Sequence, residues 1–327
     1  MWKIFQCAET GRRHRLGGMN GQDRIFVHHT PEVDAVCLSD GAGSAAYAEE
    51  GAELVTRETA MLLTEYFGSL FECNDGGSAK EWLLSELWKR LETLRQELDC
   101  DLWDLSATLL AVAVRGDDYL LLQIGDGVIG YADRKGLRPA TDPRHEDAMD
   151  TTTFVVSKDV LQRMHLSKGT SADISGFILM SDGSTRTLYE EQKGVFHPVL
   201  LKIAQRMCIG DPDLAEEDLR EITRRFLLAN TVDDCSIALL LRPGGLLCME
   251  ALSLYERREI YGFKPNERGL RSKVARLDRM MALLREPRTL GQLSRLSYCQ
   301  PRYLRRHLER LLRQGLIRRE GLRYKAY

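Results

Sequence analysis

Residues 38–44 read LSDGAGS and directly follow the apolar run Ala35-Val36-Cys37. The pattern returns at 177–183, FILMSDG, where another apolar run ends on Ser-Asp-Gly. Short apolar runs bounded by Gly and Asp predict buried strands. Two strands about 140 residues apart in the chain are therefore expected to finish on an aspartate, Asp40 and Asp182.

Two further aspartates stand at predicted strand ends. Asp126, in QIGDG, follows a predicted strand over 119–124, and Asp233, in VDDCSIALLL, precedes one over 236–241. In an antiparallel sheet, the end of one strand and the start of its neighbour share one edge. We therefore expect the four carboxylates to gather at one end of the core. Carboxylates packed together repel, and burial increases the repulsion, so such a cluster requires a countercharge.

The nature of these ligands narrows the choice of ion. The set holds no cysteine or histidine, and carboxylate oxygens favour Mg²⁺ or Mn²⁺ over zinc. Gly41, Gly127 and Gly183 each follow one of the aspartates, and we expect them to let the backbone turn sharply. A single Asp-Gly after a strand is usually only a turn, so the metal prediction rests on the four positions together.

The remaining pattern predicts the fold class. Residues 115–118, RGDD, connect two predicted strands as a hairpin, and hairpins imply antiparallel pairing. Apolar residues recur at helical spacing over 47–67, 81–98 and 213–228. Because the helices do not alternate singly with strands, the sequence favours an α+β fold, an antiparallel β-sandwich flanked by helix pairs. The other predicted strands are 25–27, 35–38, 108–114 and 177–180.

Composition places the chain among soluble globular proteins. It has 327 residues, of which 43% are hydrophobic and 29% charged. No stretch approaches the roughly 18 apolar residues of a membrane helix, and the N-terminal residues lack the apolar core of a secretory signal. The eight cysteines are scattered without a C-x-x-C pair, which is typical of reduced thiols. We expect a cytoplasmic protein with no membrane partner.

Charge is distributed unevenly. Residues 264–327 hold 18 Lys and Arg against five acids, a net charge of +13, whereas the whole chain carries −2. The rest of the chain therefore carries −15. This asymmetry predicts an acidic domain over 1–255, a linker over 256–270 and a basic domain over 271–327.

The basic domain has a pattern of its own. An apolar helix face over 274–284 ends at Pro287, Thr289 is placed to cap a second helix, and Pro301 suits the start of a third. A hairpin over 316–324 follows. Three helices and a hairpin in under 60 residues are the winged-helix pattern.

Arginines occupy the outer face of the third helix and the hairpin. A winged helix lays this helix in the major groove of DNA, with arginines on the phosphates. The alternative is a docking face for a protein, either a phosphorylated partner or the acidic domain itself. The predicted nucleic-acid-binding residues are Arg302, Arg305, Arg306, Arg313, Arg318 and Arg319.

Five short segments of the chain resemble, in order, the metal-dependent protein phosphatases of type 2C (the PPM family), and in particular a bacterial branch. The resemblance spans roughly residues 10–241. It implies a β-sandwich flanked by helix pairs, with a phosphatase domain over 1–255 and phosphoserine or phosphothreonine proteins as substrates. The five segments are GGMNGQD (17–23), SDGAG (39–43), SAT (106–108) with GD (125–126), MSDG (180–183) and DDCSI (233–237).

The resemblance also implies roles for the aspartates. Asp40 would bridge two Mg²⁺ or Mn²⁺ ions, and Asp182 and Asp233 would complete the shell of the first, so these three are the candidate catalytic residues. Two such ions share a water, lower its pKa and hold it as the nucleophile that attacks phosphorus.

Three other metal-binding roles follow from the resemblance. The Gly41 carbonyl would face the second ion, Asp126 matches a ligand of a weaker third ion, and Asp23 matches an acidic residue near the site. The position four after Asp182 is acidic in many members but is Arg186 here, which puts the third ion in doubt and offers a phosphate-binding group instead.

The sequence departs from the family at three further positions. The acidic neighbour before Asp23 is Gln22, so the second ion loses a charge. At the position where the family often has an arginine that binds the phosphate, this sequence has Gly18, and Arg13 or Arg15 is the candidate replacement. At the position where the family has a histidine proposed as a proton donor, this sequence has Ala42.

These departures keep a second hypothesis open, that of a weakly active or inactive phosphatase-like sensor whose winged helix binds DNA or a protein. A third is a phosphatase that acts on a kinase partner, with the basic domain as the docking platform. His14 fits the bacterial pattern, and both a place near the site and a structural hydrogen bond are compatible with it.

Overall fold

The computed structural model describes residues 2–133, 136–141, 152–242 and 252–326. The chain divides into two compact units. The first comprises Met1–Leu201 with Leu219–Arg242, and the second comprises Lys202–Asp218 with Pro243–Tyr327. The predicted metal-binding residues all lie in the first unit, and the arginine-rich segment lies in the second.

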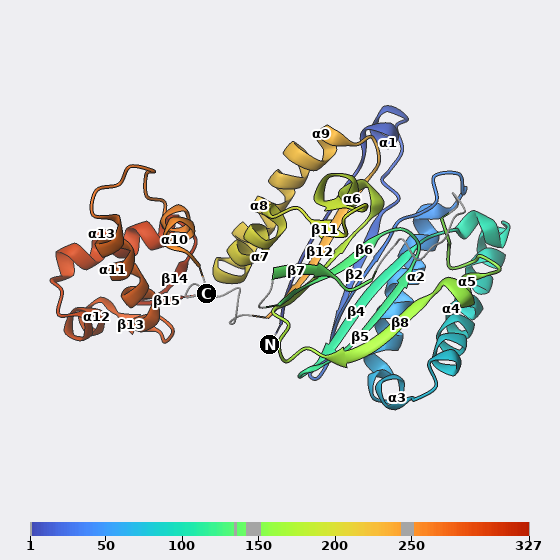
Figure 1. The fold of residues 1–327 in the computed structure, drawn as a ribbon, viewed down its shortest axis with the longest axis horizontal. Helices are drawn as coiled ribbons and strands as arrows, with labels where there is room; N and C mark the ends of the chain where they lie inside the picture. Colours follow the sequence, from blue (N-terminus) through green and yellow to red (C-terminus); the bar gives the residue numbers. More distant parts are fainter. Residues whose placement is uncertain (1, 134–135, 142–151, 243–251, 327) are drawn as a thin grey trace. The chain divides into compact units, whose positions relative to one another are not determined.

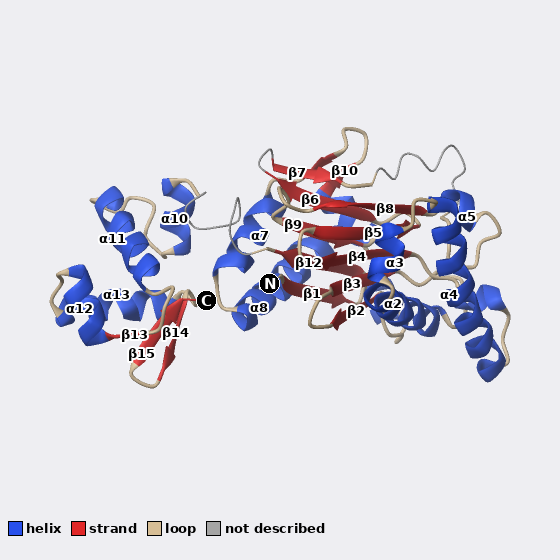
Figure 2. Ribbon diagram, turned by 90° about the horizontal axis from the view of Figure 1, so that it is seen from below, coloured by secondary structure: helices blue, strands red, loops and turns tan. Residues whose placement is uncertain are grey.

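The first unit is built on two five-stranded antiparallel sheets (Figures 1 and 2). One sheet has the order β1 (Lys3–Glu9), β12 (Cys235–Leu241), β9 (Gly176–Met180), β6 (Val128–Asp133) and β7 (Gly136–Pro139). The other has the order β2 (Arg24–His29), β3 (Asp34–Ser39), β4 (Leu109–Arg115), β5 (Asp118–Ile124) and β8 (His165–Thr170).

Helices cover the outer faces of the two sheets. The long helices α2 (Ala48–Glu65) and α4 (Gly76–Leu98) pack together and against the β2–β8 sheet (Figure 1). Helix α6 (Asp182–Leu188) and the π-helical turn η3 (Thr223–Leu227) contact strands of the other sheet. The remaining elements of this unit are α1 (Arg12–Leu16), α3 (Phe67–Glu72), η1 (Leu102–Leu105), α5 (Val160–Arg163), β10 (Tyr189–Glu190), β11 (Val195–Phe196) and α9 (Leu228–Asn230). Most of α7 (Val199–Ile209) and of α8 (Pro212–Ile222) lies within residues 202–218 and so belongs to the second unit.

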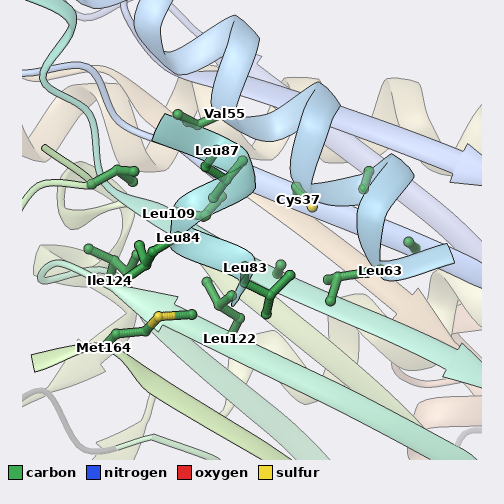
Figure 3. Packing of buried hydrophobic residues seen from close by; sticks show 14 of the residues in the cluster. Cys37, Val55, Leu63, Leu83, Leu84, Leu87, Leu109, Leu122, Ile124 and Met164 are labelled. Carbon is green, nitrogen blue, oxygen red and sulfur yellow. The ribbon is translucent and has the colours of Figure 1, made fainter. Parts of the chain in front are cut away.

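The central strands are continuous apolar runs because both of their faces are buried, and β4 is an example. Its residues alternate between two hydrophobic layers. Leu110 and Val112 pack between the sheets with residues such as Phe177, whereas Leu109 belongs to the layer beneath the helices. Figure 3 shows that second layer, with Leu83 of α4 among the strand side chains. Each fully buried leucine stabilises the fold by about 1.5–3 kcal/mol, so both layers contribute substantially.

The antiparallel sandwich with flanking helices confirms the predicted architecture of this part of the chain. The six predicted strands correspond to β2, β3, β4, β5, β9 and β12, and the predicted hairpin is formed by the pairing of Arg115 with Asp118. Four strands of the sandwich were not predicted. Among them, β8 reads HLSKGT, and it lies at a sheet edge where polar residues remain exposed, so its sequence gave no apolar signal.

The C-terminal part of the second unit contains four helices and a small sheet. The helices are α10 (Leu254–Ile260), α11 (Leu270–Leu283), α12 (Leu290–Ser297) and α13 (Pro301–Arg313). The sheet has the order β13 (Arg288–Thr289), β15 (Arg323–Ala326) and β14 (Ile317–Glu320). The hydroxyl of Thr289 accepts a hydrogen bond from the Gln292 N–H at 3.3 Å, as the predicted cap requires.

The region predicted as a linker, 256–270, carries part of the core of this unit. Tyr261 is fully buried, and its hydroxyl donates to Asp278 at 2.7 Å. Arg257 forms an ion pair with the same carboxylate at 2.8 Å. Gly262 and Pro265, which follow Tyr261, give the segment the composition of a loop, and for this reason the packing was not predicted. Residues 202–218, predicted within the first domain, also belong to the second unit.

Two further sequence expectations bear on the described residues. None of the helices described is both long and apolar enough to cross a membrane. The seven cysteines that the structure describes form no disulfide with one another, and Cys7, Cys37, Cys208 and Cys235 among them are buried.

Candidate active site

The four predicted strand-end aspartates meet in one cleft. Asp40 follows β3, Asp126 lies between β5 and β6, Asp182 begins α6 directly after β9, and Asp233 precedes β12. All four line a single cavity of about 220 Å³. Carboxylates separated by up to 193 positions in the sequence are thus neighbours in space.

Strand register produces this convergence. Met180 of β9 pairs with Ile237 of β12 on one side and with Val128 of β6 on the other, so the three strands have their aspartate-bearing ends at one edge. On the second sheet, Asp40 and Thr108 exchange hydrogen bonds: the Asp40 N–H donates to the Thr108 hydroxyl, and the Thr108 N–H donates to the Asp40 carbonyl, both at 2.9 Å.

The glycine after three of these aspartates permits close packing and is not needed for a sharp turn. Gly41, Gly127 and Gly183 all lack a positive φ, so the reason predicted for them was wrong. A Cβ at Gly183 would lie 2.0 Å from the carbonyl oxygen of Asp234, and one at Gly41 would lie 2.7 Å from that of Ala48. A side chain at Gly183 would push apart the segments that carry Asp182 and Asp233, and one at Gly41 would displace the segment after Asp40 from the start of α2.

Arg186 contacts two of the carboxylates directly. Its guanidinium lies 2.9 Å from Asp233 and 3.2 Å from Asp182, and its side chain is half exposed in the cleft. Arg13 also lines the cleft, whereas Arg15 is exposed on α1 and does not belong to the lining. Of the predicted phosphate-binding arginines, the structure therefore brings Arg13 and Arg186 to the carboxylates.

Negative charge in the cleft is only partly compensated. Burial, together with the neighbouring Asp23 and Asp182, raises the pKa of Asp40 well above its usual range. Burial also raises the pKa of Asp126, although the Thr152 hydroxyl, which donates to it at 2.7 Å, acts in the opposite direction.

Asp23 lies behind the cleft and is almost fully enclosed. It is 5% exposed, and burial raises its pKa to about 6, with a contribution from the charge on Asp234. Neither of its carboxylate oxygens makes a hydrogen bond of standard geometry with any residue that the structure describes. A buried carboxylate of this kind requires a nearby cation or a proton.

Asp234 is a further site residue, to which the sequence pattern assigned no role. Its carboxylate accepts hydrogen bonds from the N–H groups of Gly11 and Gln22, each at 2.6 Å, and lies 2.9 Å from Nδ1 of His14. These contacts fasten the 11–22 segment, which carries Arg13, to the start of β12. The Asp-Asp doublet before a strand was the available signal. His14 both lines the cleft and makes this structural contact.

These side chains form a donor set suited to a divalent cation. Asp40, Asp126, Asp182 and Asp233 supply hard oxygen ligands in one cavity, and the enclosed carboxyl group of Asp23 lies beside them. Within the described part of the chain, no three such groups already surround one point. Two of the four carboxylates, those of Asp182 and Asp233, are instead in ion pairs with Arg186.

Comparison with known proteins places the chain in a family. Residues 10–222 match the family described as Protein phosphatase 2C. The chain is 23% identical over 193 residues to Serine/threonine-protein phosphatase 3 of Escherichia coli (strain K12), covering 57% of this chain and 74% of that protein.

Solved structures show the same fold. The serine/threonine phosphatase Stp1 from Staphylococcus aureus superposes with a TM-score of 0.52 at 14% identity, over 75% of this chain and 96% of that one. A bacterial serine phosphatase superposes with a TM-score of 0.51 at 14% identity, over 75% and 99% of the two chains. The family match covers well over half of the chain, and the chain therefore belongs to the protein phosphatase 2C family of serine/threonine protein phosphatases.

Proposed function

We propose that the chain hydrolyses phosphoserine and phosphothreonine in proteins, using two Mg²⁺ or Mn²⁺ ions held by Asp40, Asp182 and Asp233. The convergence of the strand-end carboxylates in one cleft is the observation that carries the proposal. When bound, such ions lower the pKa of a water and screen the charge on the phosphoryl group. The Gly41 carbonyl would serve as a further ligand, because Gly41 also lines the cleft.

The chain's own residues organise the site around that chemistry. Asp126, held by Thr152, is the candidate ligand for a weaker third ion, and Asp23 supplies negative charge from behind the cleft. Arg186 would release Asp182 and Asp233 and donate to phosphate oxygens instead, since a guanidinium binds either anion. Arg13, which also lines the cleft on the segment held by Asp234, would be a second donor.

The proposal is tested by hydrolysis of an aryl phosphate at millimolar Mn²⁺ with Asp40→Asn and Asp182→Asn. Each change removes one charge and one ligand, and a loss of about 10²-fold or more in kcat/KM is expected. Asp99→Asn is the matched control. Asp99 is exposed with φ 51°, a conformation that asparagine tolerates, so activity should be unchanged. Equal rates in the wild type and both site variants would refute the assignment.

We propose further that residues 271–327 form a winged helix that binds DNA or a protein partner. Three helices and a three-stranded sheet, in the order along the chain that this domain type has, support the proposal. The departures at Gly18, Gln22 and Ala42 favour a sensor with little turnover, whereas a kinase substrate docked on this domain would favour full activity. Turnover of the full chain on a phosphoprotein separates the two, because the sensor predicts little turnover and a docked substrate predicts rapid turnover.

A further inference from the structure

Helix α13 presents a row of arginines without acidic partners. Arg302, Arg305 and Arg306 are exposed, and no carboxylate in the described residues forms an ion pair with any of them. Other arginines of the same unit do form ion pairs, such as Arg257 with Asp278 at 2.8 Å and Arg288 with Glu286 at 2.7 Å. The charge on the outer face of α13 is therefore left for solvent or for a ligand.

The electrostatic environment of the helix agrees with this. Burial lowers the pKa of His307, and the charges of Arg276, Arg310 and Arg306 lower it further. Helix α13 has five arginines and a single acid, Glu309. Repulsion among these cations is relieved when an anionic ligand binds.

Two exposed tyrosines accompany the arginines. Tyr298 is 97% exposed in the turn between α12 and α13, with φ 50° and ψ 34°. A bulky residue in this left-handed conformation is uncommon, and here no burial of the ring compensates for the cost. Tyr303, in the first turn of α13, is 57% exposed. Tyrosine hydroxyls and rings placed beside arginines match the phosphates and sugars of a nucleic-acid backbone.

The hairpin β14–β15 adds a second cationic element. Arg319 donates from Nε to the carbonyl of Gly321 at 2.9 Å and lies over the ring of Tyr324, 5.8 Å from its centroid. Its guanidinium is thus held in one orientation at the hairpin turn. Arg323 is exposed on the paired strand.

We propose that the turn and outer face of α13, comprising Tyr298, Arg302, Tyr303, Arg305 and Arg306, bind duplex DNA, with the β14–β15 hairpin on the adjacent backbone. The proposal rests on the winged-helix assignment above. The helix would enter the major groove with its arginines on phosphates and base edges. A duplex suits this surface because its phosphates form a regular row of anions, and the surface offers three arginines without an ion pair beside the single acid of α13, Glu309.

The negative charge of the rest of the chain determines how DNA binding should depend on salt concentration. Residues outside 264–327 carry a net −15, so the molecule as a whole does not attract DNA by its overall charge. Binding must come from the local surface, and its dependence on salt should report the few phosphates that this surface neutralises.

The experiment is fluorescence anisotropy of a labelled random-sequence 20-base-pair duplex, titrated with the full chain from 50 to 200 mM salt. The logarithm of the association constant should fall linearly with the logarithm of the salt concentration. Arg302→Ala, Arg305→Ala and Arg306→Ala should each reduce the magnitude of this slope by about one. Arg90→Ala, at an exposed position on α4, removes the same charge from the first unit and should leave the slope unchanged.

Tyr298→Ala should weaken binding at a constant slope, because it removes contacts but no charge. Absence of binding at 50 mM salt would overturn the proposal, as would equal slopes for the arginine variants and Arg90→Ala. Preferential binding of an acidic phosphopeptide at the same surface would overturn it in favour of a protein partner. Hydrogen exchange of the α13 amides in each variant reports the fold independently, so an unprotected α13 in the wild type would instead refute the winged helix.

Discussion

At the scale of single residues, the geometry of the cleft depends on backbone contacts that leave no room for a side chain. Gly183→Ala would place a methyl group 2.0 Å from the Asp234 carbonyl oxygen, so the segments that carry Asp182 and Asp233 must separate. We expect a loss of about 1–3 kcal/mol in the free energy of unfolding, measured by urea denaturation, together with a loss of phosphatase activity.

Gly76→Ala is the control for this substitution. Gly76 begins α4 with open space around it, and alanine is a better helix former, so stability should be unchanged or slightly higher. If Gly183→Ala were as stable and as active as Gly76→Ala, the close approach at the site would be wrong.

Arg186 leads to a second prediction at this scale. Its guanidinium competes with any ion for Asp182 and Asp233, but it is more than half exposed, so each pair contributes under about 1 kcal/mol. Arg186→Met should therefore tighten Mn²⁺ binding a few-fold, measured by isothermal titration calorimetry. The same variant should raise KM for an aryl phosphate, because it removes a phosphate donor. Unchanged Mn²⁺ affinity would show that the arginine does not occupy the cation position.

At the scale of elements, the strands that could be predicted from the sequence are those that form continuous apolar runs. Strands such as β4 and β9 are covered on both faces, so every residue is apolar and the strand is evident from composition alone. Strand β8 pairs through its backbone at a sheet edge, and β1, KIFQCAE, interleaves polar residues, so neither gave a comparable signal. Both are edge strands, and their stability comes largely from pairing with a neighbouring strand.

Helix α13 carries the prediction about pH. The pKa of His307 is lowered in the folded state, so the unfolded chain binds more protons once the pH falls below about 6.5, the ordinary value for histidine. The second unit should therefore lose stability as the pH falls from 7 to 5. His307→Gln should reduce this acid-side loss, measured as the change in Tm between pH 7 and pH 5. An equal loss in the variant and the wild type would remove His307 as the cause.

At the scale of the whole molecule, the carboxylate cluster could be predicted from the sequence, but the long-range contacts that stabilise each folded unit could not. Asp40, Asp126, Asp182 and Asp233 were evident because each ends or precedes an apolar run. The role of Asp234 depends on Gly11 and Gln22, more than 200 residues away, and only the folded chain shows the contact. Tyr261 was hidden in the same way, since its burial depends on helices that follow it in the chain.

The central claim is that the clustered aspartates are held together in the active enzyme by divalent ions. Anomalous scattering from crystals of the full chain soaked in Mn²⁺ tests it most directly. The account predicts two manganese peaks in the cleft, both in contact with Asp40, with Asp182 and Asp233 on one of them and Arg186 displaced from both carboxylates. A cleft without a peak, at a Mn²⁺ concentration that saturates phosphatase activity, would contradict it.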